Sequence, residues 1–445
     1  MSQLANEPIG GSELANQSIG TAPGRLDVMG GIADYSGSLL LQMPIAEQTR
    51  VVLRRRNDRL IRVQSDMEAG TFIIQKEEIE GIPYRELGER LLLRSGGSWA
   101  SYVMGCFAVL QQEQGLQFEG VDLEVSSGIP VGKGVSSSAA LEVATMHAIS
   151  KAFGLMLDPI QLAVLAQKVE NLVVGASCGL MDQLAVNLGR KDHLLPIICQ
   201  PHEVFDPLPI PGGVRFYGLD SGVRHAVSGS SYGDVRIAAF MAFTVAMMKS
   251  GISRNNLNAS GIPFGGFWAN VSPEMFAERY VPLIPLEMTG ASFLENYGVH
   301  IDPVTKIDPA TTYRLLQAAR HPVMENHRIG LFKAGLEGYS GYGDKAALLE
   351  QLGALMVGSH RGYESVGLGE PVTSRIVELL LEKGKGRGVH GARTSGGGSG
   401  GTVVVMISSN EGLDLLMKVR GLIENETEKE LKLFEGSSDG AHYIN

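Results

Sequence analysis

The sequence has no excess of basic residues. Its 445 residues include 38 Lys and Arg against 48 Asp and Glu, which gives a formal charge of −10 at pH 7. Proteins that bind nucleic acids hold the phosphate backbone with basic patches. The charge balance therefore argues against a nucleic-acid partner.

Cysteine and long apolar runs are also scarce. The three cysteines, Cys106, Cys178 and Cys199, have neither the spacing of metal ligands nor the even number of a disulfide framework. Free thiols without a recognisable signal peptide favour the reducing cytoplasm. The longest apolar run, around residues 240–248, is far shorter than the ~20 residues of a membrane span, so we expect no membrane partner.

What the sequence does contain is typical of a globular enzyme. Hydrophobic residues make up 44% of the chain, and the 57 glycines are partly clustered, which often places backbone close to a ligand. The length predicts two domains. We place them at residues 21–210 and 211–445, divided near a proline-punctuated stretch, after a loosely held terminus at 1–20 that carries a short near-repeat.

Strand and helix patterns are mixed along both halves, which predicts an α+β fold. Strands are expected at 51–53 and 60–63 around a turn, at 121–125, where polar and apolar residues alternate, and at 403–407. Helices are expected at 139–153, 160–172, 346–356 and 372–381, and after Tyr232.

Two glycine-rich segments are candidates for phosphate binding. The first follows the strand at 121–125 and runs into three serines at the start of a helix, where free N–H groups and the helix dipole attract anions. A simple serine cap is the alternative. The second, Gly396–Gly401, contains the spacing of a dinucleotide fingerprint but opens a strand instead of a helix, so a Rossmann site is excluded.

Together these segments carry a family resemblance. Three segments resemble the three ordered motifs of the GHMP small-molecule kinases: Pro23–Asp27, 130–140 and 396–401. The resemblance is narrowed to the galactokinase branch by 178–183, by Val223-Arg224-His225 and by Tyr232. The first motif, at 22–37, is most similar to the kinase domain of plant-type L-arabinokinases. So are the segments 199–201 and 434–438.

The resemblance implies a fold, an activity and a set of catalytic residues. The expected fold has a first domain like ribosomal protein S5 domain 2 and a ferredoxin-like second domain, with ATP and a sugar between them. Asp182 would be the general base and Arg25 would stabilise charge, while Ser138 and Glu170 would bind Mg²⁺. The implied reaction makes β-L-arabinose 1-phosphate and ADP, and a monomer is favoured.

The resemblance also implies the binding residues. ATP would contact Trp99, Gly132, Lys133, Gly134, Val135, Ser136, Ser137, Ser138, Gly397 and Gly398. Lys133 has a surface lysine as its alternative, and Trp99 a core aromatic residue. The sugar would contact Gly31, Ile32, Asp34, Gly179 and Tyr232.

One departure from galactokinases bears on the sugar. Where that branch has Glu-His-Thr-Asp, this chain has Gly31-Ile32-Ala33-Asp34, which removes polar partners for a sugar 6-hydroxyl. L-Arabinopyranose has the ring stereochemistry of D-galactopyranose but lacks C6, so the change favours a pentose. Galactose or galacturonate as substrate, or a non-catalytic sugar and ATP sensor, remain the alternatives.

Overall fold

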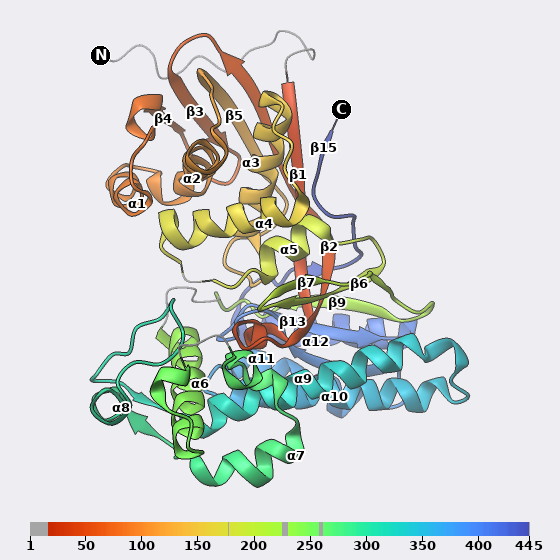
Figure 1. Ribbon diagram of the computed structural model, residues 1–445. Coiled ribbons are helices and arrows are strands. Elements are labelled where there is room, and N and C mark those ends of the chain that lie inside the picture. The colour runs from red at the N-terminus through yellow and green to blue at the C-terminus, as the bar shows by residue number, and fades with distance from the viewer. Residues whose placement is uncertain (1–16, 177, 225–229, 258–260, 445) are drawn as a thin grey trace.

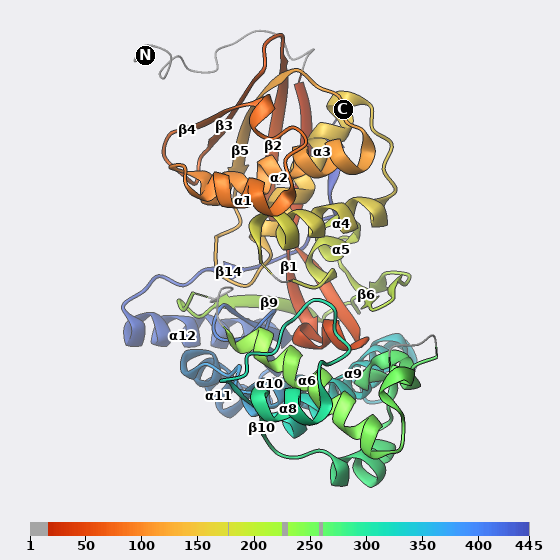
Figure 2. The ribbon, with the colours of Figure 1, turned by 60° about the vertical axis from the view of Figure 1, so that its left-hand side comes forward.

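The computed structural model describes residues 17–176, 178–224, 230–257 and 261–444. Figures 1 and 2 show two stacked parts, and a sheet lies in each. The first sheet has nine strands, six of them in the order β15-β1-β2-β5-β3-β4. Of the others, β6 pairs with β2, and β7 and β8 pair with β6. These strands are β1 (Gln17–Met29), β2 (Leu39–Arg56), β3 (Leu60–Ser65), β4 (Thr71–Gln75), β5 (Gly120–Ser127), β6 (His193–Cys199), β7 (His202–Val204), β8 (Leu208–Pro209) and β15 (His442–Ile444).

The second sheet is antiparallel and has the order β12-β13-β9-β14. Helices α10 and α11 pack on its strand β12. Its strands are β9 (Arg215–Asp220), β12 (Val389–Thr394), β13 (Thr402–Ile407) and β14 (Leu433–Phe434), and a separate pair is formed by β10 (Met288–Thr289) and β11 (Thr312–Tyr313).

The α-helices are divided between the two parts. Those of the first part are α1 (Tyr84–Leu92), α2 (Gly97–Gln114), α3 (Ser137–Phe153), α4 (Pro159–Lys168) and α5 (Met181–Leu188). Those of the second are α6 (Ser230–Lys249), α7 (Pro273–Met275), α8 (Gly290–Tyr297), α9 (Leu315–Glu337), α10 (Lys345–Ser365), α11 (Pro371–Gly384) and α12 (Asn410–Thr427). Within the described ranges, no helix is long and apolar enough to cross a membrane.

The mixed α+β fold is confirmed, and the predicted strands are all present. The strands at 51–53 and 60–63 belong to β2 and β3, but they do not pair with each other, because β5 lies between them. The alternation at 121–125 is that of β5, whose valines and leucine face the core. The strand at 403–407 is β13.

The predicted helices are present too, with one difference. The segment predicted at 160–172 is α4 followed by a π-helical turn, η4 (Val169–Val174). The helix predicted at 139–153 is α3, which packs directly on β1. A Cβ on Gly20 would lie 2.0 Å from the backbone oxygen of Ala144, so only glycine allows this contact.

Strands β1 and β2 carry the first motif from one part of the molecule to the other. Both extend from the upper part of Figure 1 into the lower, where the 3-10 helix η2 (Gly31–Ser36) connects them. Apolar side chains of both parts belong to one buried cluster, which includes Leu123 of β5 and Val404 of β13. The interface between the two parts is therefore a continuous core.

The two ends of the chain depart from the predicted boundaries. Strand β1 begins at Gln17, so residues 17–20 are paired backbone and do not belong to a loose terminus, while the near-repeat lies largely outside the described residues. Strand β15 pairs with Ile19, Gly20 and Thr21 of β1. The last residues of the predicted second domain thus complete the first sheet.

Candidate active site

The two residues predicted to act in catalysis form an ion pair. Arg25 lies in β1 and Asp182 in the first turn of α5, and the Arg25 Nη2 atom is 2.8 Å from Asp182 Oδ1. Arg25 Nε donates to the same oxygen at 2.9 Å, and Nη1 donates to the backbone oxygen of Gly134 at 2.5 Å. The guanidinium is 3% exposed and the carboxylate 25%. Asp182 is therefore oriented by a buried cation at the edge of the first glycine-rich loop.

This first loop connects β5 to α3 through a backbone that requires glycine. Gly132 and Gly134 have φ of 74° and 70°, and Ser136, at the N-cap of α3, has φ of 62°. The Ser136 hydroxyl makes no cap hydrogen bond, and it is buried without a partner in the described structure. Ser136 therefore does not form the simple serine cap that was the alternative to phosphate binding. An unpaired buried hydroxyl at a helix N-terminus instead suits an anion.

The second glycine-rich segment packs against the first. It joins β12 to β13 and includes Gly397 and Gly398. A Cβ on Gly396 would lie 3.1 Å from the Gly134 oxygen and 3.2 Å from Arg25 Nη2. The Thr402 hydroxyl, at the start of β13, donates to the backbone oxygen of Lys133 at 2.8 Å. The two segments, far apart in sequence, thus form one glycine-lined wall beside Arg25.

Two cations near this wall differ in their surroundings. The Lys133 ammonium, predicted to contact ATP, is 2.7 Å from the buried carboxylate of Asp220 in β9. Arg224 lies next to Gly132, where its Cγ would be 3.7 Å from an added Cβ, and it is exposed. The sequence analysis included Arg224 in a motif but gave it no role. His225, the next residue of that motif, is outside the described residues.

A cluster of acidic side chains lies near Asp182. Glu170, in the π-helical turn η4, is 5% exposed, and burial together with the nearby Asp182 raises its pKa to about 6. The Ser138 hydroxyl hydrogen-bonds to Glu170, so the two predicted Mg²⁺ ligands lie together. Among the described residues, no group of three or more His, Cys, Asp or Glu side chains has the arrangement of a metal centre.

The sequence analysis missed two members of this cluster, Glu142 and Gln183. The Gln183 amide donates to Glu170 Oε2 at 2.8 Å and to Glu142 Oε2 at 3.2 Å. Burial, followed by the charge of Glu170, raises the pKa of Glu142 well above its usual range. Helical spacing could have indicated Glu142, because it lies one turn after Ser138 on the same face of α3.

Three of the residues predicted to bind the sugar, Asp34, Gly179 and Tyr232, lie together near Asp182. The Tyr232 hydroxyl, from α6, donates to Asp34 Oδ1 at 2.8 Å. Burial raises the pKa of Asp34 to about 6, although Tyr232 and the nearby Arg236 oppose this shift. A Cβ on Gly179 would lie 1.8 Å from Asp34 Oδ2, so glycine is required for the chain to pass the carboxylate.

Gly31 and Ile32 lie in the same turn as Asp34 but are closely enclosed. Gly31 has φ of 47°, and a Cβ there would lie 1.6 Å from the hydroxyl oxygen of Tyr363 in α10. Ile32 is 1% exposed and belongs to a buried apolar cluster that includes Val235 and Tyr363. Position 31 therefore has no room for a side chain, because the Tyr363 hydroxyl fills the adjacent space.

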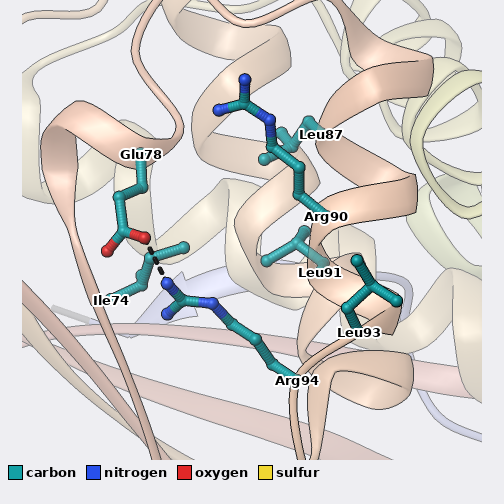
Figure 3. Close-up of a pocket in the computed structure, with 7 residues that line it drawn as sticks. All are labelled: Ile74, Glu78, Leu87, Arg90, Leu91, Leu93 and Arg94. Carbon is teal, nitrogen blue, oxygen red and sulfur yellow. Dashed lines mark hydrogen bonds and ion pairs between the residues drawn. The ribbon is translucent and has the colours of Figure 1, made fainter.

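Trp99 lies near the start of α2, one helical turn before Tyr102, and both are partly buried. The carboxylates of Glu170 and Glu142 contribute to a raised pKa of Tyr102, after burial, which places this residue near the acidic cluster. A separate cavity of about 260 Å³ lies beside α1, and none of the predicted site residues line it. Figure 3 shows the residues that do. The wall of this cavity is formed by Ile74, Glu78, Leu87, Arg90, Leu91, Leu93 and Arg94.

Comparisons with known proteins bear on the family to which the chain belongs. The GHMP kinases N terminal domain matches residues 101–190, and the GHMP kinases C terminal domain matches residues 344–417. The chain is 40% identical to L-arabinokinase of Arabidopsis thaliana over 95% of its own length, but it spans only 46% of that protein. It is 30% identical to a galactokinase of Chloroflexus aurantiacus, over 88% of this chain and 84% of that protein.

A solved structure has the same fold. The galactokinase of Lactococcus lactis, complexed with galactose, superposes with a TM-score of 0.74 at 20% identity, covering 96% of this chain and 95% of the other. The family models, the relatives and the shared fold lead to one conclusion: the chain belongs to the GHMP kinases, a family of phosphotransferases, on the branch that includes galactokinase and L-arabinokinase.

Proposed function

We propose that the protein transfers the γ-phosphoryl group of ATP to the anomeric hydroxyl of L-arabinose. The observation that carries the proposal is the buried pair of Arg25 and Asp182, held against Gly134 of the first glycine-rich loop. A carboxylate that can accept a proton thus lies at the edge of a phosphate-binding backbone. Asp34 and Tyr232, which lie near the same carboxylate, provide sugar-binding groups.

In this mechanism the anomeric oxygen attacks the γ-phosphorus while its proton passes to Asp182. The bond between the γ-phosphorus and the bridging oxygen breaks, and ADP leaves with the electron pair of that bond. Arg25 orients the Asp182 carboxylate through their ion pair and offers donors to the charge that develops on the phosphoryl group. The glycine-lined wall holds the remaining phosphates through backbone N–H groups.

A magnesium ion fits the residues next to this wall. Ser138 and Glu170 offer the hard oxygen donors that Mg²⁺ prefers, and a cation there would stabilise the ionised form of a buried carboxylate whose pKa is raised. Such an ion would neutralise charge on the ATP phosphates when bound. Gln183 would keep the Glu170 carboxylate oriented through its 2.8 Å hydrogen bond.

The choice of L-arabinose depends on position 31. The galactokinases that this sequence resembles carry a polar side chain at this position. In this chain the Tyr363 hydroxyl fills the space into which that side chain would extend. A sugar with a C6 hydroxymethyl would thus lose a partner, and burying an unpaired hydroxyl costs about 1–3 kcal/mol. The higher identity to L-arabinokinase than to galactokinase also favours the pentose.

A panel of sugars tests the proposal. We expect ATP-dependent release of ADP with L-arabinose, and kcat/KM at least about tenfold lower with D-galactose and D-galacturonate. Phosphorus NMR of the product should show an anomeric phosphate. A preference for galactose or galacturonate would move the assignment to that sugar, and no sugar-dependent ADP release from a protein that binds ATP and sugar would indicate a sensor.

A further inference from the structure

The hydroxyl of Tyr363 joins two segments of the site that are far apart in sequence. Tyr363 lies in α10 and is fully buried. Its hydroxyl donates to the backbone oxygen of Gly396 at 2.6 Å and accepts from the backbone N–H of Ile32 at 3.0 Å. One atom therefore uses both its donor and an acceptor position on backbone groups, one in the turn that carries Asp34 and one in the second glycine-rich segment.

A buried ion pair between β1 and β12 lies beside the same two segments. Asp27 Oδ2 is 2.9 Å from Arg393 Nη1, and both side chains have no exposed surface. Asp27 Oδ1 accepts from the Gly31 N–H at 3.0 Å, and Oδ2 accepts from the Gly396 N–H at 3.3 Å. Asp27 thus accepts from the N–H groups of Gly31 and Gly396. The Tyr363 hydroxyl bonds to the neighbouring backbone groups, the Ile32 N–H and the Gly396 oxygen.

The absence of a side chain at position 31 is part of this arrangement. An added Cβ would be 1.6 Å from the Tyr363 hydroxyl oxygen, 2.7 Å from Asp27 Oδ2 and 2.9 Å from the Gly396 oxygen. All three neighbours belong to the connection just described. The glycine therefore allows the sugar-binding turn to approach the second glycine-rich segment closely enough for one hydroxyl to join them.

The two segments differ in how they are otherwise supported. Both segments are flanked by paired strands, β1 and β2 for the turn and β12 and β13 for the glycine-rich segment. The glycine-rich segment also has backbone hydrogen bonds to other parts of the fold, because the Ser399 N–H donates to the Leu368 oxygen at 2.8 Å and the Gly401 N–H to the Val223 oxygen at 3.0 Å. Within the turn at 31–36, the Ala33 N–H donates to the Gly30 oxygen at 3.1 Å. A loss of the Tyr363 hydroxyl should therefore displace the sugar-binding turn more than the glycine-rich segment.

We propose that the Tyr363 hydroxyl is a positioning group that fixes the Asp34-bearing turn and so determines the affinity for the sugar. The inference rests on the proposed function, since it takes the turn to be the sugar side of a sugar kinase. Asp34 follows Ile32 by two residues, so a shift of the Ile32 backbone moves the carboxylate away from its position beside Tyr232. The phenol itself does not need to contact the substrate.

The substitution Tyr363→Phe tests this by removing the hydroxyl and keeping the ring. It leaves two buried backbone groups without a partner, and we expect the KM for the sugar to rise about five- to fiftyfold. The KM for ATP and kcat should change less than about threefold. Tyr217→Phe is the matched control, because Tyr217 is also buried but its hydroxyl has no partner in the described structure.

The assay uses whichever sugar the wild-type protein phosphorylates best. A wrong assignment of L-arabinose then appears in the wild-type panel and leaves the ratio of variant to wild type unaffected. A sugar KM within twofold of wild type for Tyr363→Phe would overturn the inference. So would an equal rise in Tyr217→Phe, or equal rises in the two KM values.

A second pair of variants examines the contact itself. Gly31→Ala should raise the sugar KM more than tenfold, because the new methyl group overlaps the Tyr363 hydroxyl and φ is unfavourable for alanine. Adding Tyr363→Phe removes the overlapping atom, so the double variant should be less impaired than the two single effects combined. Independent effects that simply multiply would contradict the proposed positioning contact.

Discussion

The proposed phosphate side and the proposed sugar side of the site are built in different ways. On the phosphate side the recognition groups are backbone atoms, exposed by left-handed residues at Gly132, Gly134 and Ser136. On the sugar side they are side chains, Asp34 and Tyr232, which come from elements 198 residues apart. A backbone site is encoded in one short stretch of sequence, whereas a side-chain site depends on how distant elements pack.

Asp182 lies where the two sides meet, and its substitution should have the largest effect. We expect Asp182→Asn to lower kcat by about 10²–10⁴-fold, because a general base contributes that much, while both substrates still bind. Single-turnover kinetics and calorimetric titration of each substrate separate the two effects. Asp414→Asn, at an exposed position in α12, serves as the control. Turnover above about a tenth of wild type would exclude Asp182 as the base.

Substitution of Asp34 tests whether the buried carboxylate proposed to bind the sugar lowers the free energy of unfolding. Its pKa of about 6 lies above the ordinary 3.8, so the folded state binds the proton more tightly than the unfolded state. The free energy of unfolding therefore falls as the pH rises between these values, and the cost is fully present above about pH 6.

Asp34→Asn removes this charge, so near neutral pH the variant should be more stable than wild type by about 1–3 kcal/mol. The gain should vanish below about pH 4. The sugar KM should nevertheless rise about ten- to a hundredfold, because hydrogen bonds to a charged acceptor are lost. Urea unfolding at several pH values and sugar kinetics measure the two effects. A variant less stable than wild type at neutral pH would contradict the burial argument.

Lys133 should have the smallest kinetic effect, because its ammonium is paired with the buried Asp220. We expect Lys133→Met to change the KM for ATP less than about threefold, while its thermal stability falls because Asp220 loses its partner. Arg224→Met, which removes the exposed cation next to Gly132, should raise the KM for ATP more. The opposite order would mean that Lys133 leaves Asp220 to bind phosphate.

Prediction from the sequence succeeds for the local patterns and fails for contacts between residues that are far apart in the chain. The strand, glycine-rich loop and helix at 120–153 are local patterns, and short motifs indicate Arg25 and Asp182, whose side chains the fold brings to within 2.8 Å of each other. The surroundings of position 31 were not predictable. Nothing near Gly31 in the sequence indicates that Tyr363, 332 positions later, fills the space in front of it.

The pairing of β15 with β1 has a consequence for how the chain folds. The partners of Ile19, Gly20 and Thr21 are Ile444, Tyr443 and His442, so one edge of β1 stays unpaired until more than 400 further residues have been synthesised. Contacts of such long sequence separation form late, because closing a long loop is entropically costly. An open edge strand can also pair with a neighbouring chain. The edge of β1 at residues 19–21 is therefore completed by a strand made long after it, and until then this short edge is open to pairing with another chain.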